Sequence, residues 1–195
     1  MKINRKLNLV VPVDLNDETS GFIHSTSISK EIFQKHVLIL AKTYSFIFSE
    51  NLNAISGPRV AYFLLKQIAE SQGEWEGKDG VENTLINEII RLSNLVYPKE
   101  KKGYDTMPLE VAIEKELIDI DEAINELVFF TCFSVINKPA QLAIWMERLN
   151  LLWNCASTPL NVMEWITSIK TSNVTANTGE MEKPSSQKSS TIVPA

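Results

Sequence analysis

The residues best suited to chemistry in this chain are two cysteines and two histidines. Neither Cys132 nor Cys155 has an adjacent base in the sequence that would activate a thiolate. Neither His24 nor His36 has a second ligand three or four residues away, and no CxxC or HExxH spacing is present. We therefore expect no catalytic residue, no cofactor and no metal site, and we expect that the protein is not an enzyme. The alternative is a small helical enzyme in which a histidine distant in sequence meets one of the thiols.

Nucleotide and nucleic-acid binding are not indicated either. Gly73, Gly77 and Gly80 come nearest to a glycine-rich loop, but their spacing matches neither the P-loop nor the dinucleotide-binding fingerprint. Three acidic residues in the same loop would repel phosphate. The formal net charge of −5 also argues against nucleic acid as the main partner, because phosphate binding needs a basic surface.

Partner binding is indicated by aromatic and methionine side chains in the last two predicted helices. Their helical spacing favours a place in the core, but on a surface the same side chains would accept an apolar helix from a partner. The run from Leu151 to Trp153 contains more apolar side chains than one helix stripe can bury. Trp75 lies in a loop of glycines and acidic residues, and we expect its side chain to be exposed. The residues that we predict for partner binding are Trp75, Trp145, Met146, Leu149, Leu152, Trp153 and Trp165.

Length and composition indicate a globular protein. A chain of 195 residues, 44% of them hydrophobic, is long enough for one domain with a full core and needs no disulfide. The longest apolar run, Leu127 to Ile136, is about half as long as a membrane-spanning helix. The segment from Met1 to Val13 lacks the apolar stretch of a secretory signal. We expect a cytoplasmic protein that does not contact membranes.

The predicted elements begin with two strands and continue as helices. Alternating apolar residues predict strands over Lys6 to Val13 and Phe22 to Thr26, a small β-hairpin within residues 1–28. Helical spacing predicts a bundle of six or seven helices over residues 29–170. One of these helices runs through Val96 and is stopped by Pro98. The predicted fold class is therefore mainly α, with a small N-terminal β-hairpin.

The ends of the predicted helices and of the chain have their own signals. Ser29 has the place of a helix N-cap, and Asp79 with Glu82 and Asp119 with Glu122 have the spacing of capping boxes. Residues 171–195 contain no aromatic residue and are dominated by polar residues and proline. Such a segment buries too little apolar area to offset its ordering entropy, so we predict a disordered tail.

Several segments together resemble a known family. The segments MKINRKLNLVVPV, GFIHSTSIS, SKEIFQKHVLILAKTYSFIFSE and GPRVAYFLLKQIAES are similar to tail assembly chaperones of long-tailed (siphovirus-type) bacteriophages or prophages. The segment RLSNLVYPKEKKGYDTMPLEVAIEKELIDIDEAINELVFFT adds to this resemblance, which covers about residues 1–169. Its motifs are diffuse and include no catalytic signature.

The resemblance implies a late viral protein that acts in the host cell cytoplasm and is absent from the mature virion. Such chaperones bind the tape measure protein, keep it soluble and help to recruit tail tube subunits around it, and in many phages a ribosomal frameshift makes a longer form. Self-association is a further expectation. The alternative within the same setting is a structural virion component, such as a neck or head-tail connector protein.

Overall fold

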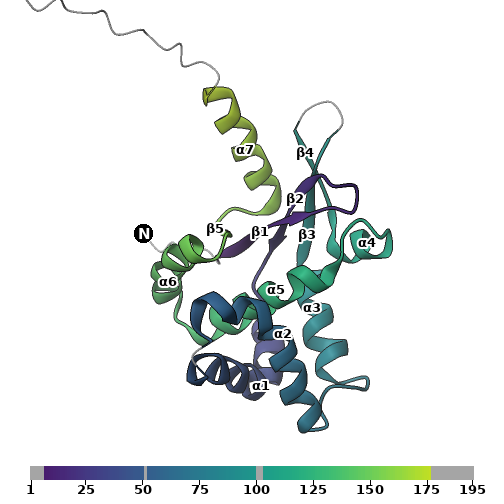
Figure 1. Ribbon diagram of the computed structural model, residues 1–195, viewed down its shortest axis with the longest axis vertical. Helices are drawn as coiled ribbons and strands as arrows, with labels where there is room; N and C mark the ends of the chain where they lie inside the picture. The colour runs from purple at the N-terminus through teal and green to yellow at the C-terminus, as the bar shows by residue number, and fades with distance from the viewer. Residues whose placement is uncertain (1–6, 51, 100–102, 177–195) are drawn as a thin grey trace, which may run out of the picture.

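The computed structural model describes residues 7–50, 52–99 and 103–176, which form an antiparallel sheet with helices on both faces (Figure 1). The strand order is β4-β3-β2-β1-β5. The strands are β1 (Asn8–Asp14), β2 (Ser20–Ser25), β3 (Ser93–Pro98), β4 (Tyr104–Pro108) and β5 (Ala156–Thr158). The helices are α1 (Lys30–Ser49), α2 (Asn53–Ser71), the π-helix η1 (Glu82–Ile86), α3 (Asn87–Arg91), α4 (Leu109–Glu114), α5 (Ile120–Ile136), α6 (Pro139–Leu152) and α7 (Val162–Ala176).

The prediction of a mainly α fold with a small hairpin is wrong, because the described residues form a mixed α/β structure. The predicted hairpin is present as β1 and β2, with Leu9 opposite Ser25 and Asp14 opposite Ser20. It is not peripheral, however, since β2 also pairs with β3 and β1 also pairs with β5. The hairpin is thus the middle of a larger sheet, and the strands that complete this sheet come from segments predicted to be helix and loop.

Strand β3 was predicted to be the end of a helix. The helix ends at Arg91, and Leu95 and Val96 are both fully buried on opposite faces of the sheet. A strand that is buried on both faces has a continuous apolar run, which periodicity alone does not distinguish from a buried helix. The polar connection after β3 then leads into β4, where Tyr97 pairs with Asp105. Strand β5 has only three residues, too few to show a periodic pattern.

The main core lies between one face of the sheet and the helices α1, α2, α3 and α5. Helix α5 is buried on several sides: Leu127, Val128, Phe129 and Phe130 are each at most 1% exposed. Four consecutive residues of a helix point in different directions, so α5 has protein around most of its circumference. It packs on α2, α1, β1 and α6.

The opposite face of the sheet is covered in part by α7, which Figure 1 shows at the top of the molecule, away from α1 and α2. Val10, Val96 and Ile166 are buried there without belonging to the main core. Helix α7 continues to Ala176 and so includes residues 171–176 of the segment for which a disordered tail is predicted. Residues 177–195 of the predicted tail lie outside the described residues.

Two predicted N-caps form. The Ser29 hydroxyl accepts a hydrogen bond from the Ile32 N–H at 3.3 Å, and the Asp119 carboxylate accepts one from the Asp121 N–H at 3.0 Å. The predicted capping box at Asp79 does not form, and this carboxylate pairs with Lys35 at 3.0 Å. Helix α2 begins at Asn53 and contains Pro58.

The start of α7 is tied to the first two strands through one backbone carbonyl. The Leu160 oxygen accepts a hydrogen bond from Asn8 Nδ2 at 2.8 Å and a second from His24 Nε2 at 3.1 Å. Helix α7 then opens with a reciprocal capping box, in which Asn161 and Glu164 each bind the other's backbone N–H. These bonds fix where α7 leaves the sheet.

We expect that Gly57→Val destabilises the protein by about 1–3 kcal/mol, the usual cost of overpacking a filled core. A Cβ added at Gly57 would lie 2.8 Å from Ile47 Cγ2 and 2.8 Å from Phe129 Cε2, and both side chains are fully buried. Chemical denaturation followed by circular dichroism measures the change. Gln67→Val introduces the same side chain at an exposed position of the same helix and is the matched control. Equal stability of the two variants would contradict the close contact at Gly57.

Candidate protein-binding surface

The residues predicted for partner binding do not form one surface. Four of them are buried within the main core, at 4%, 0%, 4% and 7% exposure: Trp75, Met146, Leu149 and Trp153. The expectation that Trp75 is exposed is wrong. Its indole packs against the Tyr62 ring at 5.9 Å between centroids, and the Lys66 ammonium lies over it at 5.4 Å. The glycine-containing loop therefore folds this side chain inward.

Trp165 is half-buried against the sheet. Its ring packs edge-on against Phe22, with 5.3 Å between centroids, and lies 6.1 Å from the His24 ring. These contacts are with the face opposite the main core, so Trp165 attaches α7 to its own chain. Its aromatic surface serves the fold in this structure.

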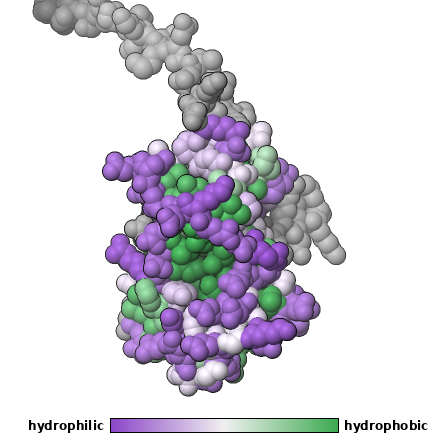
Figure 2. All heavy atoms as spheres, turned by 90° about the vertical axis from the view of Figure 1, so that its right-hand side faces the viewer, coloured by the Kyte–Doolittle hydropathy of each residue, from purple (hydrophilic) through white to green (hydrophobic). Residues whose placement is uncertain are grey.

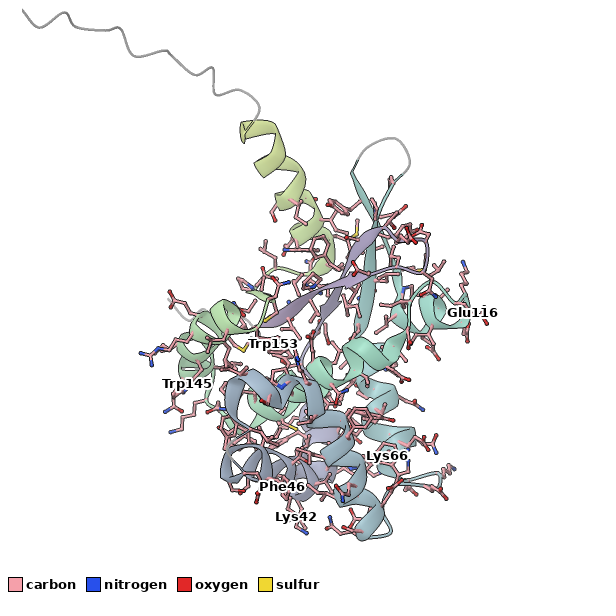
Figure 3. The ribbon with its side chains drawn as sticks, viewed as in Figure 1. Lys42, Phe46, Lys66, Glu116, Trp145 and Trp153 are labelled. Carbon is pink, nitrogen blue, oxygen red and sulfur yellow. The ribbon has the colours of Figure 1, made fainter. Side chains whose placement is uncertain are left out.

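Trp145 and Leu152 are the predicted residues that remain exposed, at 45% and 60%. Both lie on the outer side of α6, whose inner side contributes Leu142, Met146 and Leu149 to the core. Figure 3 shows Trp145 projecting away from the body, whereas Trp153 lies between α6 and the sheet. The outer side of α6 therefore presents large apolar side chains that the described chain leaves uncovered, next to the exposed polar residues Gln141, Glu147 and Arg148.

The outer side of α6 shares a pattern with α1 and α2. In each of these helices, one large apolar residue precedes a basic residue by four positions, and another follows it by four positions. We call these three sets the outer stripes: Leu38, Lys42 and Phe46 on α1, Ile55, Arg59 and Phe63 on α2, and Ile144, Arg148 and Leu152 on α6. Residues four apart lie on the same side of a helix, so each stripe runs along one exposed face.

The six apolar side chains of the outer stripes are 41–64% exposed. Helix α2 packs against both α1 and α6, so the stripes belong to one group of helices. A groove of 390 Å³ adjoins the α1 stripe and is lined by Lys42, Phe46 and Ile68, among others. Figure 3 shows Lys42 and Phe46 projecting from the lower edge of the molecule. Exposed apolar side chains at helical spacing are typical of surfaces that bind another helix.

The stripes on α1 and α2 were not among the predicted residues. The sequence pattern assigned the main apolar stripe of each helix to the core and left Leu38, Phe46 and Phe63 unexplained. The signal that would have found them is the set of large apolar residues outside the core stripe, which lie four residues before and four residues after a basic residue. In an amphipathic helix, the large apolar residues outside the core stripe are the ones that indicate a binding surface.

The face next to α4 has a different character. Figure 2 shows hydrophobic side chains gathered in the middle of this face and surrounded by hydrophilic ones. A groove of 440 Å³ between α3 and α4 is lined by Ile90 and Ile113 and by the charged residues Glu88, Arg91, Glu110 and Glu114. Arg91 is paired with Glu88 at 2.7 Å, so the charge that remains in this α3–α4 groove comes from Glu110 and Glu114 and is opposite in sign to that of the outer stripes.

The two cysteines are held as unreactive thiols. Burial raises the pKa of the Cys132 thiol to about 12, and burial together with the nearby Glu126 charge raises the pKa of the Cys155 thiol to about 12. Both thiols are therefore protonated at neutral pH, and a thiol is a poor nucleophile. The Cys155 thiol donates to Asn150 Oδ1 at 3.2 Å. Among the hydrogen bonds of the described residues, none joins a cysteine to a histidine.

Metal binding and membrane insertion find no support within residues 7–50, 52–99 and 103–176. No group of three or more histidine, cysteine, aspartate or glutamate side chains in this part of the chain is placed to hold a metal ion. None of the helices described there combines the length and the apolar character of a membrane-spanning segment.

Comparisons of the chain with protein-family models, with curated proteins and with solved structures found no match.

We expect that Trp165→Ala lowers the free energy of unfolding by about 1–3 kcal/mol, because it removes the ring packing that holds α7 on the sheet. Thermal and chemical denaturation measure this change. Met163→Ala, at a 61% exposed position of the same helix, is expected to stay within about 0.5 kcal/mol of the native protein. If the two substitutions had the same small effect, α7 would not be held by Trp165.

We expect that stability falls between pH 7.5 and pH 5.5, in part because of His36. Burial and the Lys35 charge lower the pKa of His36 in the folded protein, although the Glu74 charge opposes this. Its ring nitrogen Nε2 lies 2.7 Å from Thr84 Oγ1. A histidine whose pKa is lower when folded binds protons better when unfolded. Its contribution is therefore complete above the ordinary pKa of about 6.5 and is lost as the pH falls through the folded value.

Denaturation curves of the native protein and of His36→Gln at both pH values measure this contribution. The loss of stability should be smaller in the variant. Glu126 acts in the opposite sense, because burial raises the pKa of its carboxyl group. It is present in both proteins, so the difference between the curves isolates His36. An equal loss in the two proteins would contradict the role given to His36.

Proposed function

We propose that the protein is a holding chaperone of phage tail assembly. In this role it binds the tape measure protein, keeps it soluble and helps to recruit tail tube subunits. The resemblance of the sequence segments to tail assembly chaperones suggests this class of function. The observation that carries the proposal is the set of outer stripes, in which three neighbouring helices each present large apolar side chains to solvent.

The size of the stripes suits reversible holding. Burying a large apolar side chain completely stabilises a complex by about 1.5–3 kcal/mol, and the six side chains of the stripes are already partly covered. Their combined contribution is thus on the order of 6 kcal/mol. Association itself costs about 4–15 kcal/mol in lost freedom of movement. One stripe alone would bind very weakly, and several stripes acting together would hold a client that can later be released.

The client best matched to such a surface is a long helix. Apolar side chains four residues apart on a helix contact a second helix whose apolar residues have the same spacing. Helical segments with an exposed apolar side aggregate, and a holding protein prevents this by covering that side. A holding protein therefore needs exposed apolar surface and no catalytic residue.

The test is co-expression with the tape measure protein encoded in the same genome, followed by size-exclusion chromatography of the soluble fraction. We expect the two proteins to elute together, with the tape measure protein insoluble when it is expressed alone. An insoluble tape measure protein, with this protein eluting alone as a ring-sized species, would refute the chaperone proposal and favour a neck or connector component.

We expect that the double substitution Trp145→Ser and Leu152→Ser reduces the recovered client severalfold. The change removes apolar surface from the outer side of α6 and leaves its buried side intact, so the melting temperature should change little. The matched control replaces Gln141 and Glu147, exposed residues of the same helix, with serine. Equal recovery of client with both double variants would show that the outer side of α6 does not bind the client.

A further inference from the structure

We propose that the outer stripes bind helices with an acidic residue between two apolar residues, in the order apolar, acidic, apolar at four-residue spacing. This inference rests on the proposed function and names the chemistry of the client segment. The three stripes share one arrangement although they occur on three different helices: the central residue is Lys42, Arg59 or Arg148, and no stripe has an acidic centre.

Two of the three basic groups have neighbours that hold them at the surface. The Lys42 ammonium donates to Gln72 Oε1 at 2.7 Å, and the Arg148 guanidinium lies 5.7 Å from the centre of the Trp145 ring. Both partners are uncharged. Neither Lys42 nor Arg148 forms a salt bridge with another described residue, so the positive charge of each stays available to an incoming carboxylate.

Arg59 has a second role, because its charge opposes the rise in the pKa of the Glu126 carboxyl that burial causes. Its side chain is nevertheless exposed on the outer side of α2, between Ile55 and Phe63. A test that replaces Arg59 must therefore include a measurement of stability.

The charges of the whole chain are distributed in agreement with this inference. Residues 30–71, which include α1 and α2, contain five basic and three acidic residues, although the chain has a net charge of −5. Residues 103–126 contain eight acidic residues and one basic residue. The excess of positive charge is thus on α1 and α2, which carry two of the three outer stripes, and complementary charge is what selects one partner among many apolar helices.

The spacing sets the geometry of recognition. Residues four apart on a helix are separated by about 6 Å along its axis, so each stripe places its two apolar side chains about 12 Å apart with the charge between them. A client helix with the same spacing would bring its own carboxylate opposite the basic group. Exposed ion pairs strengthen binding only about two- to fivefold each, but three pairs acting together would give a preference of at least about tenfold.

The experiment compares three synthetic helical peptides with the full-length protein. The peptides have identical leucines at the apolar positions and differ only at the central position, which is glutamate, glutamine or lysine. Binding is measured by isothermal titration calorimetry at low salt and again in about 0.5 M salt. We expect the glutamate peptide to bind about two- to fivefold more tightly than the glutamine peptide and the lysine peptide to bind more weakly still, and we expect salt to remove these differences because it screens exposed charges.

Charge reversal in the protein is the decisive comparison. We expect the triple variant Lys42→Glu, Arg59→Glu and Arg148→Glu to prefer the lysine peptide. The double variant of Lys42 and Arg148 should show the same reversal to a smaller degree, and it keeps the test valid if loss of Arg59 unfolds the protein. The control variant Lys30→Glu, Lys78→Glu and Lys115→Glu changes the net charge equally at exposed positions outside the stripes and should keep the glutamate preference.

Two results would overturn the inference. The first is equal binding of the three peptides, or a glutamate preference that survives charge reversal. The second is a set of three observations: the native protein self-associates with rising concentration, the triple variant does not, and no peptide is preferred. These observations would mean that the stripes bind the acidic α3–α4 groove of a second copy. Sedimentation velocity measures this self-association.

The failure of this inference is distinguishable from the failure of the proposed function. A soluble complex with the tape measure protein, without peptide preference, would refute only the acidic chemistry of the client. A clear peptide preference with an insoluble tape measure protein would uphold the chemistry of the stripes and refute the chaperone role.

Discussion

Helix α5 has to be buried around most of its circumference, and the arrangement of the other elements follows from this requirement. The consecutive residues Leu127, Val128, Phe129 and Phe130 point in different directions and are all fully buried. One layer cannot cover such a helix. The sheet covers it on one side, and α1, α2 and α6 cover it on others. Rings extend this packing outward, since Phe129 contacts both Phe133, at 5.9 Å, and Trp153, at 5.2 Å.

The same requirement accounts for the surface of the molecule. Helices α1, α2 and α6 pack with their inner sides on α5, on the sheet and on one another. No other element of the described chain covers their outer sides. Apolar residues there remain 41–64% exposed in the outer stripes, so folding buries them only in part. Single exposed apolar residues are common on proteins, but here one spacing around a basic residue recurs on three neighbouring helices. We interpret it as a binding pattern.

The parts of the fold that could be predicted are those in which one physical signal dominates. Alternation identified β1 and β2, and the hydroxyl of Ser29 identified the start of α1. Strand β3 was missed because Leu95 and Val96 are both buried, which removes alternation, the usual signal of a strand. Pairing partners far apart in sequence, such as β1 with β5, have no local signal at all. The sheet could therefore not be assembled from the sequence pattern.

The candidate site was predictable only in part, for a related reason. Helical spacing placed Trp145 and Met146 on the same helix but did not say which of the two faces solvent, and the structure buries one and exposes the other. Trp75 shows the limit most clearly, since a loop rich in glycine and acidic residues carries a buried indole. Neighbouring elements decide exposure, and their positions depend on the missed strands.

The two hydrogen bonds to the Leu160 carbonyl have a consequence for biosynthesis. They join Asn8 and His24 to a residue 152 and 136 positions later, and β1 likewise pairs with β5 near the same place. A ribosome therefore releases the first hairpin long before the residues that complete its sheet exist. During that interval one edge of β1 and the apolar side chains beneath α7 lack their partners, a state that favours aggregation of nascent chains. Folding of this protein can become complete only after residue 166 has been synthesised. The edge of β1 and the apolar side chains beneath α7 are therefore most prone to aggregation while the chain is still being made.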